Sequence, residues 1–195
     1  TLQAAGISAA ETELVQADGR VYLQSRRFDR TPQGRVGMVS LEMYDAHYIG
    51  IGTQWAATAV ETGRAGSEKL SAADIQTLCL LDAFGALIAN SDRHHGNVSL
   101  LLFNHRWQLA PAYDMLPMFY APVAGEVVPR DWASQAPRPN ANTLGVWPQA
   151  RDLALAFDMP LEGVQVSHAE GAGCYGHNGA DDVAFDAAWL AHLLP

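Results

Sequence analysis

The sequence predicts an α+β domain that is mainly helical and contains two β-hairpins. Residues 75–89 are almost entirely apolar, which is typical of a buried helix. Two β-rich runs flank the turn at residues 17–19, where an Asp-Gly pair favours a tight hairpin because glycine adopts positive φ without strain. Two further β-rich runs, at residues 98–103 and 107–110, flank a second polar turn. One long helix and two hairpins therefore define the predicted fold class.

The composition is that of a globular protein. The chain has 195 residues, of which 49% are hydrophobic and 17% are charged, so it can form one core with room for a second small unit. No apolar run is long enough to span a bilayer, and the N-terminus lacks the basic and apolar regions of a signal peptide. We therefore expect a cytoplasmic protein without membrane association, in which Cys79 and Cys174 are free thiols.

The charge distribution bears on nucleic-acid binding. A formal net charge of −9 argues against general binding to a phosphate backbone, which needs clustered Lys and Arg. Five of the twelve basic residues nevertheless fall in the first quarter of the chain: Arg20, Arg26, Arg27, Arg30 and Arg35. They form either a solvated hairpin face or a local contact patch. The first interpretation is slightly favoured, and we expect no direct nucleic-acid partner.

The elements before the long helix are short. Residues 12–25 are expected to form the first hairpin, and residues 31–34 a turn. Residues 36–48 lack a clean periodicity and are predicted to form a short helix and a loop. Residues 54–62 are predicted to add another helical turn.

The long helix has a recognisable start and end. Ser71 is a suitable N-cap and Asp74 occupies the capping-box position, where both side chains satisfy exposed N–H groups. The apolar residues that follow cover nearly every side, so this helix is expected to be the buried spine of a helical lobe. It ends at Asn90 and Ser91, and it delivers Asp92 to a fixed place.

Frequent prolines shape the region after the second hairpin. Those between residues 117 and 139 exclude long regular elements. Pro148 suits the first turn of a helix that continues through residues 150–157.

A dense polar stretch, residues 90–97, lies between the helix and the second hairpin. Phosphoryl transfer needs a carboxylate that deprotonates the attacking hydroxyl and oxygen ligands that hold Mg²⁺ against the nucleotide. Asp92, Asn97 and the later Asp114 have the order and approximate spacing of such groups in protein kinases, and His94 falls where a cation would face the transferred phosphate. The alternatives are turn and capping chemistry, or a zinc site, which is less favoured because no second Cys/His cluster is near.

Three motifs carry a family resemblance. They are Asn-Ser-Asp-Arg-His-x-Gly-Asn-x-Ser at residues 90–99, Leu-Ala-Pro-Ala-Tyr-Asp-Met-Leu-Pro at residues 109–117 and Arg-Phe-Asp-Arg at residues 27–30. Together they resemble the C-terminal lobe of the HipA-like serine/threonine kinases, the toxin half of bacterial toxin–antitoxin pairs. The resemblance covers about residues 1–157.

The resemblance implies a kinase-like lobe with particular site residues. Asp92 would be the catalytic base, assisted by His94, and Asn97 and Asp114 would be the Mg²⁺ ligands. The expected cofactors are Mg²⁺ and ATP, and the expected partners are a protein substrate and a helix-turn-helix antitoxin.

The nucleotide-facing end of the site is the second implication of the resemblance. Arg27, Phe28 and Asp29 would lie at the hinge that binds the adenine ring. Kinases also need a glycine-rich loop and a strand lysine that pairs with the phosphates. Lys69 is the only lysine here and has no strand pattern around it, so we expect most of the N-lobe to be missing and ATP binding to be weakened. An inactive, kinase-shaped module that contacts a partner is the alternative.

The last segment, residues 158–195, differs in character from the rest. It predicts a strand at residues 163–167, a glycine-rich loop at residues 171–179 and an amphipathic helix at residues 183–194. Residues 166–182 are similar to a segment of molybdenum hydroxylase large subunits. We expect no molybdopterin binding by this piece alone, because those enzymes build the site from distant parts of a longer chain. A redox role is the third and last hypothesis, and the segment is expected to form a separate, loosely docked unit.

Overall fold

The fold is known from a computed structural model. It describes residues 2–52, 54–64, 70–123, 126, 128–135 and 137–156. Lys69, Cys174 and the predicted unit at residues 158–195 lie outside the described residues, as does its boundary with the preceding helix.

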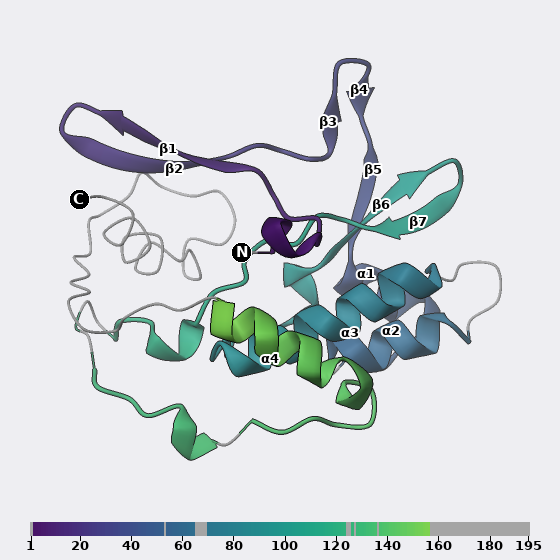
Figure 1. Cartoon of the computed structure of the whole chain (residues 1–195). Coiled ribbons are helices and arrows are strands. Elements are labelled where there is room, and N and C mark those ends of the chain that lie inside the picture. Colours follow the sequence, from purple (N-terminus) through teal and green to yellow (C-terminus); the bar gives the residue numbers. More distant parts are fainter. Residues whose placement is uncertain are drawn as a thin grey trace.

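Helix α3 (Ala72–Leu87) is the centre of the helical layer. It packs against α2 (Trp55–Thr62) on one side and α4 (Trp147–Ala156) on the other, and α1 (Leu41–Tyr48) lies beneath the sheet (Figure 1). The predicted spine is therefore confirmed. The expected helical turn near residue 54 is the complete helix α2.

The start of α3 follows the predicted capping chemistry. Ser71 Oγ accepts a hydrogen bond from the backbone N–H of Asp74 at 3.1 Å and donates one to the Asp74 carboxylate at 2.8 Å. Every residue from Leu78 to Gly85 is buried, which agrees with a helix that is apolar on all sides. Cys79, the free cysteine among the described residues, lies in this run, and burial raises the pKa of its thiol to about 11.

A three-stranded antiparallel sheet covers the helices. Its order is β5 (Gly37–Ser40), β6 (Ser99–Phe103) and β7 (Arg106–Leu109), so the second predicted hairpin is confirmed. The helix and loop expected for residues 36–48 are wrong in their first part, which is strand β5. A four-residue strand is defined by its distant partner β6 and not by a local pattern. Helix α1 then follows directly.

The N-terminal hairpins project from the helical layer (Figure 1). Strands β1 (Thr12–Ala17) and β2 (Arg20–Ser25) pair across Asp18 and Gly19, both at positive φ, as predicted. The expected turn at residues 31–34 is a small hairpin of β3 (Arg30–Thr31) and β4 (Gly34–Arg35).

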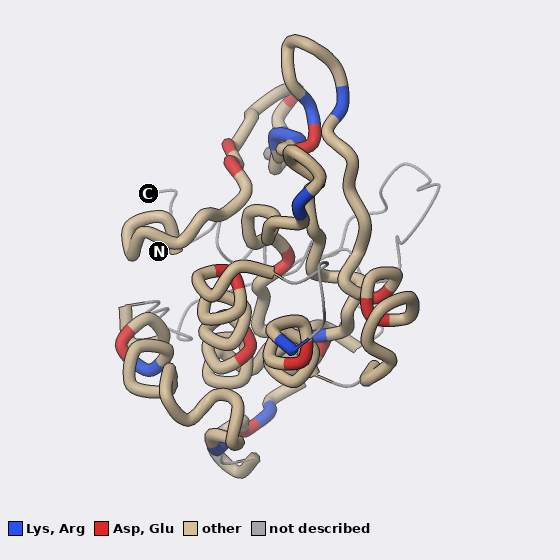
Figure 2. The backbone as a smooth tube through the Cα atoms, turned by 90° about the vertical axis from the view of Figure 1, so that its right-hand side faces the viewer, with Lys and Arg blue, Asp and Glu red and all other residues tan. Residues whose placement is uncertain are grey.

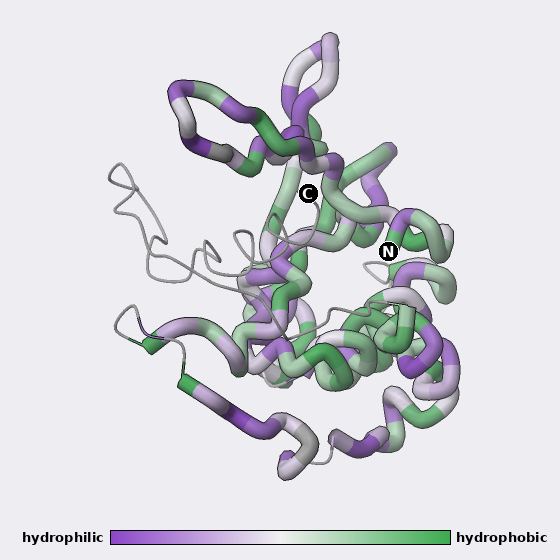
Figure 3. Tube along the Cα trace, turned by 60° about the vertical axis from the view of Figure 1, so that its left-hand side comes forward, coloured by the Kyte–Doolittle hydropathy of each residue, from purple (hydrophilic) through white to green (hydrophobic). Residues whose placement is uncertain are grey.

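The core lies between the sheet and the helices. Tyr44 and Trp107 meet edge to face at 6.2 Å between ring centroids, which joins α1 to β7. Trp55, Leu78 and Leu100 are at most 1% exposed. Figure 3 shows hydrophobic residues gathered along the helices, whereas the β3–β4 tip is paler or hydrophilic.

The remaining described elements are short or simple. Pro148 lies in the first turn of α4 as predicted, and no described helix is long and apolar enough to cross a membrane. The 3₁₀ helices of the described residues are η1 (Gln3–Ala5), η2 (His95–Asn97), η3 (Met118–Tyr120), η4 (Ala133–Gln135) and η5 (Leu144–Val146).

Candidate active site

The candidate site begins at the C-terminal end of α3. The chain leaves the helix through Ala89, at φ +63°, and reaches Asn90, which is only 1% exposed. The Asn90 side chain accepts a hydrogen bond from the backbone N–H of Asp92 at 2.9 Å and donates one to the carbonyl of Asp114 at 3.3 Å. One amide therefore joins the two segments that carry the predicted acids.

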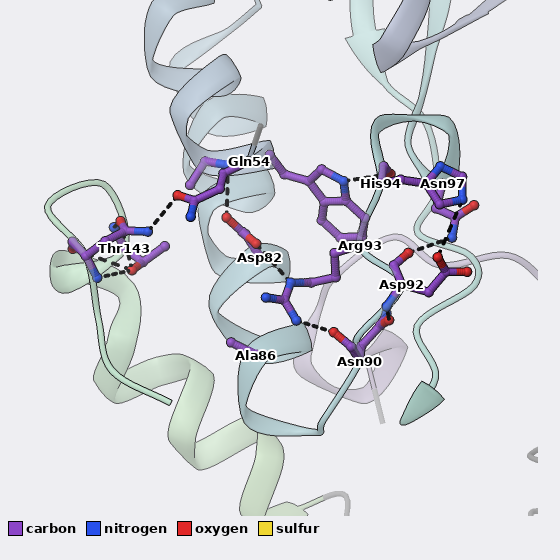
Figure 4. A network of polar contacts seen from close by, with 12 residues as sticks. Gln54, Asp82, Ala86, Asn90, Asp92, Arg93, His94, Asn97 and Thr143 are labelled. Carbon is purple, nitrogen blue, oxygen red and sulfur yellow. Dashed lines mark hydrogen bonds and ion pairs between the residues drawn. The ribbon is translucent and has the colours of Figure 1, made fainter. Parts of the chain in front are cut away.

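Asn97 lies beside Asp92. Its Nδ2 donates to the Asp92 carbonyl at 3.0 Å, as Figure 4 shows, so Oδ1 is the side-chain atom that is left for a cation. The Asp92 carboxylate is 36% exposed and remains accessible from solvent.

Asp114 has an unusual backbone conformation. Its φ of +55° lies in the left-handed region, which costs a residue with a Cβ roughly 1 kcal/mol and is tolerated best by Asn and Asp. Among the described residues, no hydrogen bond or ion pair engages its carboxylate. A carboxylate left without protein partners can serve as a cation ligand.

An ion pair supports the loop from the helix side. Arg93 Nε donates to Asp82 Oδ1 at 3.1 Å, while Asp82 Oδ2 accepts from the backbone of Ala56 at 3.1 Å. The other end of Arg93 donates to the Asn90 carbonyl, so its guanidinium spans α3 and the loop (Figure 4). Gly85 makes room for it, since a Cβ there would lie 2.5 Å from Arg93 Cδ.

His94 is oriented by its neighbours. Its Nδ1 accepts from the Gly96 N–H at 3.0 Å, which places the proton of a neutral ring on Nε2, 4.0 Å from Asp92 Oδ1. The His94 carbonyl accepts from the Trp55 indole at 2.9 Å. A Cβ at Gly96 would lie 2.7 Å from the imidazole, so glycine allows this close approach.

A buried polar group lies on the α1 side of the loop. His95 Nε2 is 2.9 Å from Thr58 Oγ1, and Thr58 donates to Asp45 at 3.2 Å, so the imidazole acts as the donor to Thr58. Asp45 also accepts the backbone N–H groups of Ile51 and Gly52. Burial lowers the pKa of His95, although nearby carboxylates partly oppose the shift.

An open groove of ≈ 730 Å³ runs past the loop. It is lined by Glu42, Asp45, Ala46, Gly52, Ser91, Asp92, Arg93, His94 and His95. Asn97 lines a small adjacent cavity instead, and Asp114 lines neither. The two predicted catalytic residues therefore line the groove, whereas the two predicted metal ligands do not.

Tyr113 connects this loop to the predicted hinge. Its hydroxyl donates to the Gly96 carbonyl at 3.2 Å and lies 2.7 Å from Ser99 Oγ, and its ring is 5.8 Å from that of Phe28. Burial raises the pKa of Tyr113, so the phenol stays protonated and keeps its donor role. Phe28 thus lies next to the residue that precedes Asp114.

The residues flanking Phe28 bind each other. Arg27 donates two hydrogen bonds of 2.8 Å to the two Asp29 oxygens, and Arg30 lies 3.5 Å from the same carboxylate. The hydrogen bond from Arg27 is the main reason that the pKa of Asp29 is lowered. Figure 2 shows the Arg positions grouped around these hairpins, and this internal pairing neutralises part of the cluster.

The donor set bears on the kind of metal that would fit. Among the described residues, no three His, Cys, Asp or Glu side chains lie close enough to hold a metal ion. Zinc needs such a cage, whereas Mg²⁺ takes one or two protein oxygens and completes its shell with water and phosphate. The Asn97 amide oxygen and the Asp114 carboxylate, which has no hydrogen-bond or ion-pair partner among the described residues, are oxygen donors of the type that Mg²⁺ takes.

The predicted site residues are thus partly assembled. Asp92, Asn97 and Asp114 share one hydrogen-bonded network through Asn90, and His94 lies beside Asp92. The supporting residues Asp82, Arg93 and His95 are not apparent from motif spacing alone. Asp82 carries a signal that could identify it, because a charge inside an otherwise apolar helix must have a buried partner.

Comparisons with known proteins place the chain in a family. The HipA-like C-terminal domain family matches residues 1–162. Toxin YjjJ of Escherichia coli K12 is 34% identical over 158 residues, which cover 80% of this chain and 35% of that protein, so the chain spans about a third of its relative's length.

One solved structure has a similar fold, and a second is a weaker match. A HipA from Shewanella oneidensis, determined in a complex with HipB and operator DNA, superposes with a TM-score of 0.53 at 15% identity, over 83% of this chain and 48% of that one. A Helicobacter pylori proinflammatory kinase, CtkA, covers 58% of this chain and 40% of its own, at 20% identity with a TM-score of 0.40. On the family match and the 34% identity, the chain belongs to the HipA-like C-terminal domain family.

Proposed function

We propose that this chain is the catalytic lobe of a HipA-like serine/threonine protein kinase that transfers phosphate from Mg²⁺-ATP to a protein hydroxyl. One observation carries the proposal: the buried Asn90 amide bonds to the backbones of Asp92 and Asp114, and the Asn97 side chain bonds to the Asp92 carbonyl. A solvated turn does not need this convergence of two distant segments on one side chain that is 1% exposed.

Asp92 is the proposed catalytic base. Its carboxylate is accessible and lines the groove, where a substrate hydroxyl can approach it. His94 lines the same groove, and its Nε2 lies 4.0 Å from Asp92 Oδ1. It would donate a hydrogen bond to the transferred phosphate from the Nε2 side.

Asn97 and Asp114 are the proposed metal ligands, through Oδ1 and the carboxylate respectively. Bound Mg²⁺ would neutralise charge on the nucleotide phosphates. The hydrogen bond from Asn97 to the Asp92 carbonyl holds a metal ligand at a fixed position relative to the base.

The adenine end of the nucleotide is proposed to lie near Phe28. The Phe28 ring contacts Tyr113, and the Tyr113 hydroxyl is bonded to Gly96 in η2 and to Ser99 in β6, on either side of Asn97. Arg27 and Asp29 are occupied with each other, and on this proposal they stiffen the hinge while Phe28 contacts the base.

The partners are proposed from the relatives. The HipA from Shewanella oneidensis was determined with HipB and operator DNA, and we propose a helix-turn-helix antitoxin as a partner of this protein. The use of ATP fits a cytoplasmic location. An inactive module that only contacts such a partner is the second candidate, favoured by the observation that Asn97 and Asp114 do not line the groove that holds Asp92.

Two variants test the proposal. Phosphate transfer from labelled Mg²⁺-ATP to a generic substrate, such as myelin basic protein, is measured for the chain alone and for the chain supplied with a nucleotide-binding lobe. Asp92→Asn should lower transfer by about 10²–10⁴-fold, the usual contribution of a general base, and leave the fold intact. Asp152→Asn, the same change on the exposed face of α4, should leave transfer unchanged.

Calorimetry separates the two candidates. A kinase lobe should bind Mg²⁺-ATP, and removal of the Asp114 carboxylate by Asp114→Asn should weaken that binding. The inactive module would be favoured if the chain captured an antitoxin-like partner, showed no nucleotide binding by calorimetry and transferred no phosphate.

A further inference from the structure

We infer that Asn90 is a positioning residue that fixes Asp92 and Asp114 with opposite sides of one amide group. The inference rests on the proposed function, since it names the group that couples the proposed base to a proposed metal ligand. It assigns to Asn90 a task beyond ending the helix and forming a turn.

The two contacts of the amide are chemically distinct. Only its oxygen can accept the hydrogen bond from the Asp92 N–H at 2.9 Å, and only its NH₂ group can donate to the Asp114 carbonyl at 3.3 Å. The orientation of the amide is therefore set by its partners. Each of these two hydrogen bonds, called an arm below, reaches the backbone of a different proposed site residue: the Asp92 arm through the oxygen and the metal-side arm to Asp114 through the NH₂ group.

The amide is itself held still. Asn90 is 1% exposed, its backbone N–H donates to the Gly85 carbonyl at 2.9 Å, and its carbonyl accepts from Arg93. Arg93 is in turn paired with Asp82 on α3. A side chain anchored to the central helix in this way can transmit its rigidity to both of its partners.

The hydrogen bond to the Asp114 carbonyl acts at a residue with an uncommon backbone conformation. Asp114 lies at φ +55°, and such residues keep their conformation only when several contacts determine it. The Asn90 NH₂ group holds the carbonyl of that residue and so helps to fix the direction of its carboxylate. Loss of a partner that orients a metal ligand typically lowers metal affinity or activity by about 10–100-fold.

The local turn requires only one of the two arms. An Asp or a Ser at residue 90 can still accept the Asp92 N–H. An ionised Asp cannot donate to the Asp114 carbonyl, and the Ser hydroxyl, which ends one bond nearer to the backbone than the Asn90 NH₂ group at 3.3 Å, should not reach it. Asn90→Asp and Asn90→Ser therefore break the metal-side arm alone, and the serine variant does so without burying a charge. Asn90→Ala breaks both arms.

The experiment measures phosphate transfer as a function of Mg²⁺ concentration for the full chain, with the nucleotide-binding lobe supplied. Asn90→Asp and Asn90→Ser should raise the half-saturating Mg²⁺ concentration by about 10-fold or more, with kcat at saturating Mg²⁺ within about 3-fold of wild type. Asn90→Ala should also lower kcat, by about 10-fold or more. Asn140→Asp, the same change in an exposed turn, is the matched control and should change neither quantity.

A second measurement does not depend on activity. Exchange of the Asp92 backbone amide, followed by NMR, should remain slow in Asn90→Ser and become fast in Asn90→Ala. Wild-type Mg²⁺ dependence in the serine and aspartate variants of an active protein would overturn the inference, and so would an Asp92 amide that is equally protected in the alanine variant. If the wild type transfers no phosphate, the proposed function fails, while the exchange experiment still decides what Asn90 holds.

Discussion

Two asparagines in this protein perform the same local task in different surroundings. Asn90 Oδ1 accepts the backbone N–H two residues ahead at 2.9 Å, and Asn140 Oδ1 does the same with Asn142 at 2.9 Å. Both NH₂ groups then reach a distant segment, the Asp114 carbonyl in one case and the Gln54 side chain in the other. Asn90 is 1% exposed, whereas Asn140 lies at the surface.

The difference shows what converts a turn into a candidate site. At Asn140 both partners can exchange the protein for water at little cost. At Asn90, which is 1% exposed, water replaces the amide less readily, so the hydrogen bonds help to fix positions as well as satisfy groups. The two turns differ in the burial of the asparagine and in the partner of its NH₂ group, which is the Asp114 carbonyl for Asn90 and the Gln54 side chain for Asn140.

The support beneath Asn90 should give the largest effect on stability. Each Asp82 oxygen accepts one hydrogen bond, from Arg93 or from the Ala56 N–H. In Asp82→Asn one of these oxygens becomes an NH₂ group, so one donor faces another donor, and the Arg93 charge loses its partner. Because Asp82 is 8% and Arg93 26% exposed, the free energy of unfolding should fall by about 3 kcal/mol in urea denaturation. Asp152→Asn, in an ion pair that is more than 60% exposed on both sides, should cost less than about 1 kcal/mol.

The two turns can be compared directly by truncation. Asn90→Ala leaves the Asp92 N–H and the Asp114 carbonyl, both partly buried, without this partner, and should cost about 1–2 kcal/mol of unfolding free energy. Asn140→Ala should cost about 0.5–1 kcal/mol, the usual value for an exposed capping residue. Equal losses in the two variants would mean that burial does not distinguish the turns.

The free energy of unfolding should depend on pH through His95, which lies on the α1 side of the loop. Since burial lowers the pKa of His95 below its ordinary value of about 6.5, the unfolded chain takes up a proton before the folded protein does. Stability should therefore be complete above that pH and decrease as the pH falls towards the folded-state pKa, by at most about 1.4 kcal/mol per pH unit. Glu42, Asp45, Asp82 and His94 also face this imidazole.

His95→Gln isolates that contribution. Glutamine can still donate to Thr58 but cannot titrate, so its unfolding free energy should depend less steeply on pH between about 6.5 and 5.5. Identical slopes for wild type and variant would show that His95 is not responsible for the acid sensitivity.

The smallest predicted effect concerns the placement of His94. Gly96→Ala introduces a Cβ 2.7 Å from the imidazole and should displace the ring, lowering phosphate transfer by about 10-fold. Gly145→Ala is the control, because a Cβ there meets nothing within 4 Å, and it should leave transfer unchanged.

Local chemistry made much of the fold predictable. The Ser71 cap, the Asp18-Gly19 turn and the apolar run of α3 each depend on neighbours in sequence, and each is found as predicted. The sequence predicts helix and loop in place of strand β5 because β6, its partner among the described strands, lies far along the chain.

In the candidate site, too, contacts between residues distant in sequence could not be predicted. The order and spacing of Asp92, Asn97 and Asp114 in the sequence are enough to select them as candidate site residues. They do not indicate that Arg93 turns back to Asp82, or that His95 pairs with Thr58, since both contacts depend on how helices pack. The roles of the site residues, including Arg27, Phe28 and Asp29, stay predictions until they are tested by mutation.

The hydrogen bond from Trp55 to the His94 carbonyl has a practical consequence for spectroscopy. The Trp55 side chain is 1% exposed, and its indole N–H is attached at 2.9 Å to the loop that carries Asp92. Indole emission depends on the hydrogen bonding and polarity around the ring, so this tryptophan is an intrinsic fluorophore in direct contact with the loop. In a variant where the other four tryptophans of the sequence are replaced by phenylalanine, a single emission spectrum would follow the loop in solution without an added label.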